Sequence, residues 1–519
     1  MIYFKASWAA LGAALLVVSC GGGDGDALGT QNANPARGEL MQTPPPRIAS
    51  MSAADFTAKL QASMSGLGLL QLAGTPVCGV DVQYIKYGTV GGVNEATNAS
   101  GALMVPTGSD PKCSGARPIV LYAHGTNITK RYNLADFVDS TNPAYSEAQL
   151  LAALYAAQGY IVVAPNYAGF DSSPLSYHPY LNADQQSKDM MDALSAARKA
   201  LPVLLSPTSA SAKLFITGYS QGGHVAMATH RAMQAAGTPV TASAPMSGPY
   251  ALAAFTDAIF YGSVPAGSTI FAPLVATSYQ KAYGNLYNAT TDFYEAIYAT
   301  GIESLLPGIY DFTTVVTNGK LPQLALFNST PPTPAFAAIT PPTGTGTPPG
   351  ATDPLFAAGF GTSNLIKNTV RLSYLQDAAA NPDGVLPAFT TGATAANPQN
   401  PIRLAAKRND LRGWTPAAPV LLCAGSGDPT IFYSLNTQVM AALWGPQVSA
   451  QLVTVLNVDS PATGPNDPFA AAKAGFAAAK ANTANAAGVN AVAAVTAAYH
   501  GGLVPPYCNA AARGFFSQF

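Results

Sequence analysis

The sequence predicts an α/β fold in which helices cover both faces of a mostly parallel β-sheet. Short apolar runs recur along the chain, at 118–123, 160–164, 240–246 and 419–425. Continuous apolar runs of this length are typical of strands buried on both faces. Stretches with helical character, at 146–158, 184–201 and 225–235, separate the first three of these runs from one another. Such alternation of strand and helix is typical of a parallel sheet with right-handed crossovers.

The N-terminal residues predict export. Lys5 supplies a positive charge, and the apolar stretch 6–18 that follows is too short to span a bilayer. This stretch ends in Val17-Val18-Ser19-Cys20, which resembles a bacterial lipobox. We therefore expect a lipoprotein signal peptide over 1–20, lipidation of Cys20 and a flexible linker over 21–50. The alternative is an ordinary signal peptide in which Cys20 has no role. The protein would then be an outer-membrane lipoprotein or a secreted protein.

The charge content agrees with export and excludes one class of partner. Charged residues make up only 10% of the 519 residues, whereas an average soluble protein has about 25%. The 25 basic and 26 acidic residues nearly cancel, so the chain lacks the basic character of a nucleic-acid-binding protein. No further apolar run approaches 18 residues, so we expect no transmembrane helix and a membrane contact through the lipid anchor alone.

Four cysteines remain after Cys20, and an even number in an exported chain predicts disulfides. Four cysteines allow three pairings. We favour Cys78 with Cys113 and Cys423 with Cys508, because the members of each pair are nearer to each other in the order of elements. No Cys-x-x-Cys motif or histidine pair at ligand spacing appears, so we expect no metal and no cofactor.

The strand pattern lapses between 249 and 416, which predicts a large insertion in a catalytic domain formed by 51–248 and 417–519. An insertion of this length between sheet strands is most often a cap over the functional site. Tyrosines recur in it at helical spacing, at Tyr279, Tyr283 and Tyr287. They would form either the core of the cap or a substrate-contacting surface.

The motif Gly218-Tyr219-Ser220-Gln221-Gly222 lies between the apolar run 214–216 and the helical stretch 225–235. Its form is that of a nucleophile elbow, a tight strand-to-helix turn that exposes a serine hydroxyl. Gly218 and Gly222 would leave room for the helix to pass close to the strand. This context favours Ser220 as a nucleophile over a chance motif in a loop.

A serine hydroxyl needs an adjacent base, which an acid must orient. The chain has five histidines. His124 precedes the serine, and His224 and His230 lie on the helix that Ser220 begins, so His500 is the predicted base. Asp428 directly follows the strand run 419–425 and is the predicted acid, with Asp459 as the second choice.

A developing oxyanion needs preorganised N–H donors, for which we predict the backbones of Gln221 and Thr126. We expect His124 to shape the loop before Thr126 rather than to transfer protons. With these motifs and Ala164-Pro-Asn-Tyr-Ala-Gly169, the chain resembles the α/β-hydrolases of the esterase and lipase kind. The resemblance covers most of 80–510 except the insertion. It implies a Ser220–Asp428–His500 triad with an oxyanion hole at Thr126 and Gln221, and a cap similar to that of capped secretory lipases.

The prediction is therefore an exported serine hydrolase that cleaves carboxylic esters through an acyl-enzyme. An aromatic-rich, charge-poor insertion favours an apolar acyl or aromatic substrate, and ester polymers belong to this class. A peptidase on the same fold is the alternative within hydrolases, because amide cleavage uses the same triad. An adhesion module that keeps the fold without catalysis is the alternative outside enzymes.

Overall fold

The computed structural model describes residues 35–341 and 354–519. The predicted signal peptide 1–20, its Cys20 and the first part of the predicted linker lie outside these ranges. The strands in the described residues are β1 Arg47–Met51, β2 Gly79–Val90, β3 Ala96–Thr107, β4 Gly115–Ala123, β5 Ile161–Pro165, β6 Thr208–Tyr219, β7 Ala242–Met246, β8 Val420–Ala424 and β9 Val453–Asn457.

These strands form one sheet in the order β1-β2-β3-β5-β4-β6-β7-β8-β9. Strands β1, β2 and β3 pair antiparallel, and β3 is antiparallel to β5. All pairs from β5 to β9 are parallel, as the apolar runs predicted. The carboxyl ends of the parallel strands therefore meet at one edge, where sites of open α/β sheets collect.

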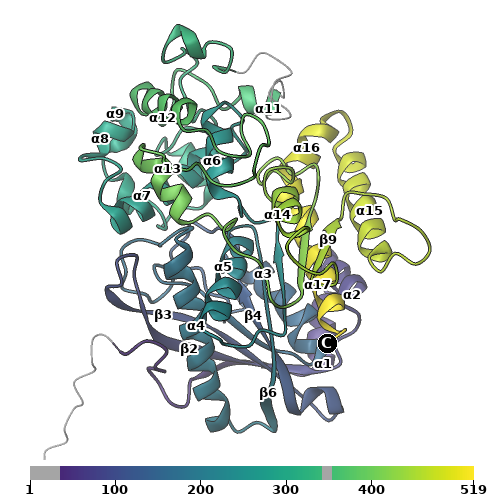
Figure 1. Cartoon of the computed structure of the whole chain (residues 1–519). Helices are drawn as coiled ribbons and strands as arrows, with labels where there is room; N and C mark the ends of the chain where they lie inside the picture. Colours follow the sequence, from purple (N-terminus) through teal and green to yellow (C-terminus); the bar gives the residue numbers. More distant parts are fainter. Residues whose placement is uncertain (1–34, 342–353) are drawn as a thin grey trace, which may run out of the picture. The chain divides into compact units, whose positions relative to one another are not determined.

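The helices are α1 Ala53–Gln61, α2 Met64–Ala73, α3 Tyr145–Leu154, α4 Ala183–Ala200, α5 Gln221–Ala235, α6 Leu252–Phe260, α7 Ser268–Tyr283, α8 Thr290–Phe293, α9 Ala296–Ala299, α10 Phe312–Thr317, α11 Pro354–Ala357, α12 Asn368–Ala380, α13 Pro401–Arg408, α14 Thr437–Trp444, α15 Ala470–Ala487, α16 Ala491–Ala498 and α17 Val504–Phe516. Helices α4 and α5 pack against each other and against the sheet, while α2, α3 and α17 form a second packed group (Figure 1). Both faces of the sheet are thus covered.

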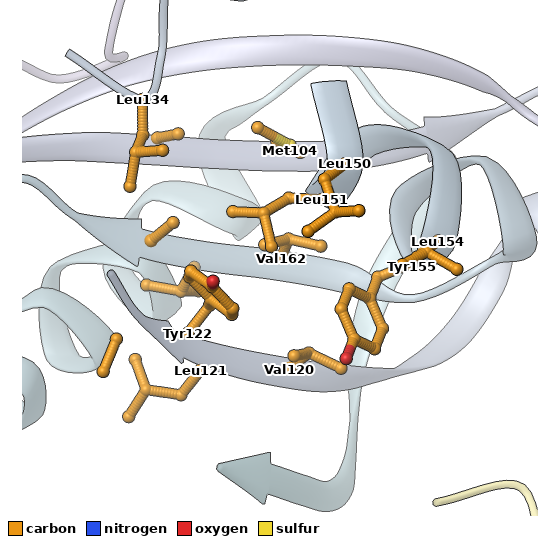
Figure 2. Packing of buried hydrophobic residues seen from close by; sticks show 14 of the residues in the cluster. Met104, Val120, Leu121, Tyr122, Leu134, Leu150, Leu151, Leu154, Tyr155 and Val162 are labelled. Carbon is orange, nitrogen blue, oxygen red and sulfur yellow. The ribbon is translucent and has the colours of Figure 1, made fainter. Parts of the chain in front are cut away.

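The core lies between the sheet and these helices. Figure 2 shows side chains of β4 and β5, among them Val120 and Val162, facing Leu151 and Tyr155 from α3 and the turn after it. All four residues are fully buried. A sheet with apolar side chains on both faces has to be covered on both, and this is why the parallel strands have continuous apolar runs.

The predicted linker 21–50 is wrong in its last residues. Arg47–Met51 form β1, which pairs antiparallel with β2, and Leu40 forms an isolated bridge with Tyr87. The sequence pattern did not reveal this strand, because the predicted linker is polar and has prolines at 44–46, directly before the strand. Edge strands are half exposed and need little apolar periodicity, and this strand shows only intermediate and exposed positions.

The chain between β7 and β8 carries α6 to α13, which Figure 1 shows in teal to green shades, gathered beyond one end of the strands. These helices have their own hydrophobic cluster, which includes the buried side chains of Tyr279 and Tyr287. A buried ion pair ties α13 to α6, because Arg403 lies 2.9 Å from Asp257. The insertion is therefore a packed unit, while its predicted bounds and those of the other domains remain predictions.

Both favoured cysteine pairings are present in the structure. Cys78 is joined to Cys113, and Cys423 is joined to Cys508, which fastens β8 to α17. Within the described parts of the chain, no helix is both long and apolar enough to cross a bilayer.

Candidate active site

Ser220 lies at the turn between β6 and α5. Its backbone has φ 60° and ψ −123°, a conformation that L-residues rarely adopt. The Ser220 N–H donates to the carbonyl of Met246 at 3.0 Å, which fixes the turn to the end of β7. The strained turn lifts the hydroxyl away from the strand, as the motif predicted.

The glycines of the elbow are required by close backbone contacts. A Cβ on Gly222 would lie 1.9 Å from the carbonyl oxygen of Ala123, and one on Gly218 would lie 2.4 Å from the carbonyl oxygen of Gly222. Helix α5 therefore passes so close to the ends of β4 and β6 that only hydrogen atoms fit between them.

His500 connects the serine to an acid. Its Nε2 lies 2.8 Å from Ser220 Oγ, and its Nδ1 lies 2.7 Å from Asp428 Oδ2. His500 belongs to a π-helical turn, Tyr499–Leu503, which joins α16 to α17. Such turns are rare and frequently occur at functional sites. The structure thus brings together the three side chains that the sequence singled out from distant positions.

Asp459, the second choice for the acid, does not contact His500. Its Oδ2 accepts from the Tyr499 hydroxyl at 2.6 Å, and both carboxylate oxygens lie within 2.9 Å of Lys480 Nζ. The Tyr499 hydroxyl in turn accepts from the N–H of Gly427 at 2.9 Å. Asp459 therefore fixes Tyr499, the residue before His500, and through it the loop that carries Asp428.

Thr126 follows β4 on a loop that reaches toward Ser220, and Gln221 begins α5. The Thr126 hydroxyl lies 2.8 Å from the Tyr180 hydroxyl. The backbone N–H of the preceding residue, Gly125, donates to Oε1 of Glu147 at 3.4 Å. His124 is fully buried, with its ring nitrogens 2.6 Å from the Gly125 carbonyl and 3.2 Å from the Asn166 carbonyl. Its contacts are those of a residue that shapes the loop.

Solved structures share this architecture. A single-site mutant of the rice cell wall degrading esterase LipA from Xanthomonas oryzae is 27% identical, with a TM-score of 0.61 over 85% of this chain and 95% of that one. A ligand-bound form of the same esterase is 24% identical, with a TM-score of 0.64 over 92% of this chain and 98% of that one. The chain is an α/β-hydrolase of the esterase and lipase kind.

A third structure agrees in fold alone. A candidate hydrolase from Legionella pneumophila aligns with the present hydrolase at 18% identity and a TM-score of 0.60, over 92% of this chain and 97% of that one. Neither the protein-family models nor the curated proteins give a match to the sequence.

Two further histidines of the hydrolase, His224 and His230, are buried and make their hydrogen bonds to groups other than Ser220 Oγ. His224 Nε2 lies 2.9 Å from the Asn409 carbonyl, and His230 Nδ1 lies 2.8 Å from the Ser243 hydroxyl. Burial lowers the pKa of each to about 4. In the described ranges, no group of three or more His, Cys, Asp or Glu side chains could hold a metal ion.

His178 is the residue that sequence reasoning missed. It belongs to no motif and lies in an irregular loop between β5 and α4, so no pattern marked it. In the structure it is buried and its Nε2 lies 2.7 Å from the side-chain nitrogen of Gln221. A histidine followed by proline in a loop gives no signal of this contact, which depends on tertiary packing.

Two spaces meet at Ser220. The inner cavity, of about 120 Å³, extends into the insertion and is lined mostly by apolar side chains of α6 and α7, among them Phe255, Ile259 and Val275. The outer cleft, of about 800 Å³, is lined by His500, Thr126 and Tyr145 among others. Ser220 and Phe271 line both spaces. A bound ester would therefore have one side in an apolar enclosure and the other in a wider cleft.

Proposed function

We propose that this chain is an exported serine hydrolase that cleaves carboxylic esters with an apolar acyl group through a covalent acyl-enzyme. The observation that carries the proposal is the unbroken chain of contacts from Ser220 Oγ through His500 to the Asp428 carboxylate. A serine hydroxyl becomes nucleophilic when a base of this geometry takes its proton.

In the proposed reaction, Ser220 Oγ attacks the ester carbonyl carbon while His500 Nε2 accepts the hydroxyl proton. Asp428 holds the Nδ1–H of the ring and stabilises the imidazolium that forms. The N–H groups of Gln221 and Thr126 stabilise the oxyanion of the tetrahedral intermediate. His500 then protonates the leaving alcohol, and a water molecule repeats the sequence on the acyl-enzyme.

The inner cavity supports an apolar acyl group. Burying apolar surface stabilises a complex by about 25 cal/mol per Å², and the cavity walls are mostly side chains of this kind. We assign the leaving group to the outer cleft, which is large enough for a bulky alcohol or a polymer segment. The insertion would then act as the cap that closes the acyl side.

The substrate class is tested with p-nitrophenyl esters of graded acyl length, run beside polyester films. We expect kcat/KM to rise with acyl length until the cavity is filled and then to fall. Equal rates for acetate and all longer esters would contradict a role of the inner cavity in acyl selection. Release of soluble products from a film would extend the substrate class to polymers.

The nucleophile is tested with Ser220→Ala. We expect loss of ester hydrolysis and of labelling by a fluorophosphonate probe, with an unchanged thermal unfolding midpoint, because the substitution removes one half-exposed hydroxyl. Activity or labelling that survives in this variant would refute the assignment. If neither the wild type nor the variant cleaves any ester, the result would favour the non-catalytic alternative.

Export is supported by the two disulfides, which persist in oxidising compartments. We propose in addition that Cys20 carries the lipid anchor. Metabolic labelling with an alkyne fatty acid tests the anchor, and the label should be lost in Cys20→Ser. A secreted, unlabelled protein would show that the N-terminal stretch is an ordinary signal peptide.

A further inference from the structure

One loop contacts the side chains of both residues whose backbone N–H groups are the proposed oxyanion donors. The loop after β5 carries His178, whose Nε2 lies 2.7 Å from the side-chain nitrogen of Gln221. Two residues later it carries Tyr180, whose hydroxyl lies 2.8 Å from the Thr126 hydroxyl. The two residues of each contact lie far apart in the sequence, because Gln221 begins α5 and Thr126 follows β4. The loop thus links the two halves of the oxyanion hole.

The surroundings of His178 determine which of its ring nitrogens donates a hydrogen bond and which accepts one. Burial lowers the pKa of His178 to about 3, so the ring is neutral at working pH. Its Nδ1 lies 2.9 Å from the carbonyl oxygen of Ala168, which can only accept. The proton is therefore on Nδ1, and Nε2 accepts a hydrogen bond from the Gln221 amide. This tautomer fixes the side chain that begins α5.

A column of rings joins the same two regions. The His178 ring stacks on Tyr167 with centroids 5.5 Å apart, and Tyr167 stacks on His124 at 4.1 Å. The Tyr167 hydroxyl donates to the carbonyl of His124, two residues before Thr126, at 3.2 Å. Tyr167 has φ 67°, a conformation that is unfavourable for a non-glycine residue and persists only where packing imposes it.

Donors stabilise an oxyanion only when their spacing is fixed before the reaction, because they then need no reorganisation. We propose that His178 and Tyr180 are positioning residues that set the spacing of Gln221 and Thr126 for the transition state. The inference rests on the proposed function. Both side chains are buried, so the contacts are shielded from competition by water.

The first test is Tyr180→Phe, which removes one hydroxyl and keeps the ring. We expect kcat to fall about tenfold, less than the ~10²–10³-fold loss of a whole donor, with KM within about twofold. The Ki of a trifluoromethyl ketone should rise by a factor similar to the fall in kcat, because its adduct with Ser220 is an oxyanion. Tyr180 also lines the inner cavity, and a mere substrate contact would raise KM instead.

A double-mutant cycle identifies the partner. Thr126→Val should give a loss similar to that of Tyr180→Phe, and the double variant should lose little more than either single variant, because both remove one contact. Multiplicative losses in the cycle would overturn the proposed coupling.

The contact between His178 and Gln221 is tested with His178→Phe, which keeps a ring against Tyr167 but removes the acceptor. Gln221→Met removes the amide and leaves its backbone N–H. We expect each to lower kcat about tenfold and the pair to be non-additive. Unchanged kcat and unchanged ketone Ki in both would refute the role of His178.

Tyr155→Phe is the matched control. The Tyr155 hydroxyl is buried and donates to Asn509 at 3.1 Å, away from both spaces at Ser220. Its loss should lower the unfolding midpoint with kcat unchanged. If Ser220→Ala is inactive while Tyr180→Phe and His178→Phe behave like this control, the positioning role fails and the proposed function stands. Activity in Ser220→Ala would instead refute the proposed function.

Discussion

At the scale of single residues, the Asp428 side chain has a defined partner for each oxygen. Oδ2 lies against His500 Nδ1, while Oδ1 accepts from the backbone N–H groups of Thr430 at 2.9 Å and Ile431 at 3.0 Å. The side chain is completely buried, so no water competes for these positions. The carboxylate therefore fixes both the ring orientation and the tautomer of His500.

The prediction at this scale concerns Asp428→Asn. An amide in this position can present its NH₂ group to Nδ1, which favours the tautomer with the proton on Nε2, and such a ring cannot accept the Ser220 proton. We expect kcat to fall about 10⁴-fold with little change in the unfolding midpoint. Steady-state kinetics beside circular dichroism check both values.

Asp459→Asn is the comparison, because Asp459 supports Tyr499 rather than the base. We expect it to lower kcat less than tenfold, since one hydrogen bond to the neighbour of His500 is weakened. A larger loss in Asp459→Asn than in Asp428→Asn would reverse the assignment of the acid.

At the scale of elements, the junction of β4, β6 and α5 is determined by backbone contact. The glycines at 218 and 222 let α5 start directly beside the carbonyl ends of two strands. Helix α5 consequently begins at Gln221, directly after Ser220, so the positive end of the helix dipole lies beside the serine and would favour an anion there.

We predict that Gly222→Ala is severely destabilising. The added Cβ would meet the Ala123 carbonyl oxygen at 1.9 Å, and the strand cannot move without breaking the sheet. The expected loss is more than about 4 kcal/mol of unfolding free energy, or a failure to fold, as measured by urea denaturation.

Gly514→Ala is the matched control for this prediction. Gly514 lies inside α17, and a Cβ there would have no heavy atom within 4 Å. We expect an unchanged or slightly higher unfolding free energy, by up to about 1 kcal/mol, because alanine restricts the unfolded chain. Equal losses in the two variants would show that the close contact is not the cause.

At the scale of the whole molecule, the fold keeps four of the five histidines buried. Burial lowers the pKa of His124, and lowers those of His178 to about 3 and of His224 and His230 to about 4. Their pKa in an unfolded chain is about 6.5. Between these values the unfolded chain binds more protons than the folded one, so stability increases with pH and falls as the pH drops below about 6.5.

The prediction is tested by measuring how one histidine, His230, contributes to the change of the unfolding free energy with pH. Between pH 7 and pH 5, His230 should account for a loss of about 2 kcal/mol of unfolding free energy. His230→Gln should therefore lose less stability over this interval than the wild type, as measured by urea denaturation at both pH values. Parallel losses in the two proteins would show that His230 does not couple stability to pH.

The sheet and the triad could be predicted because they follow local rules. Buried parallel strands have continuous apolar runs, and an elbow needs glycine at 218 and 222 whatever the rest of the chain does. His500 could be found by elimination, since the other histidines considered precede the serine or lie on its helix. Strand β1 could not be found, because a half-exposed edge strand has no apolar signature.

By itself, the sequence determined the fold class and the parallel strands with continuous apolar runs, and it favoured one candidate triad and one of the three cysteine pairings. Only the tertiary structure decided that Asp428 rather than Asp459 contacts His500, and that His178 and Tyr180 contact the side chains of Gln221 and Thr126. The physical reason is that strand patterns and elbows arise from contacts between near neighbours in the chain. The contacts of a loop side chain depend on which distant backbone the packed sheet brings beside it.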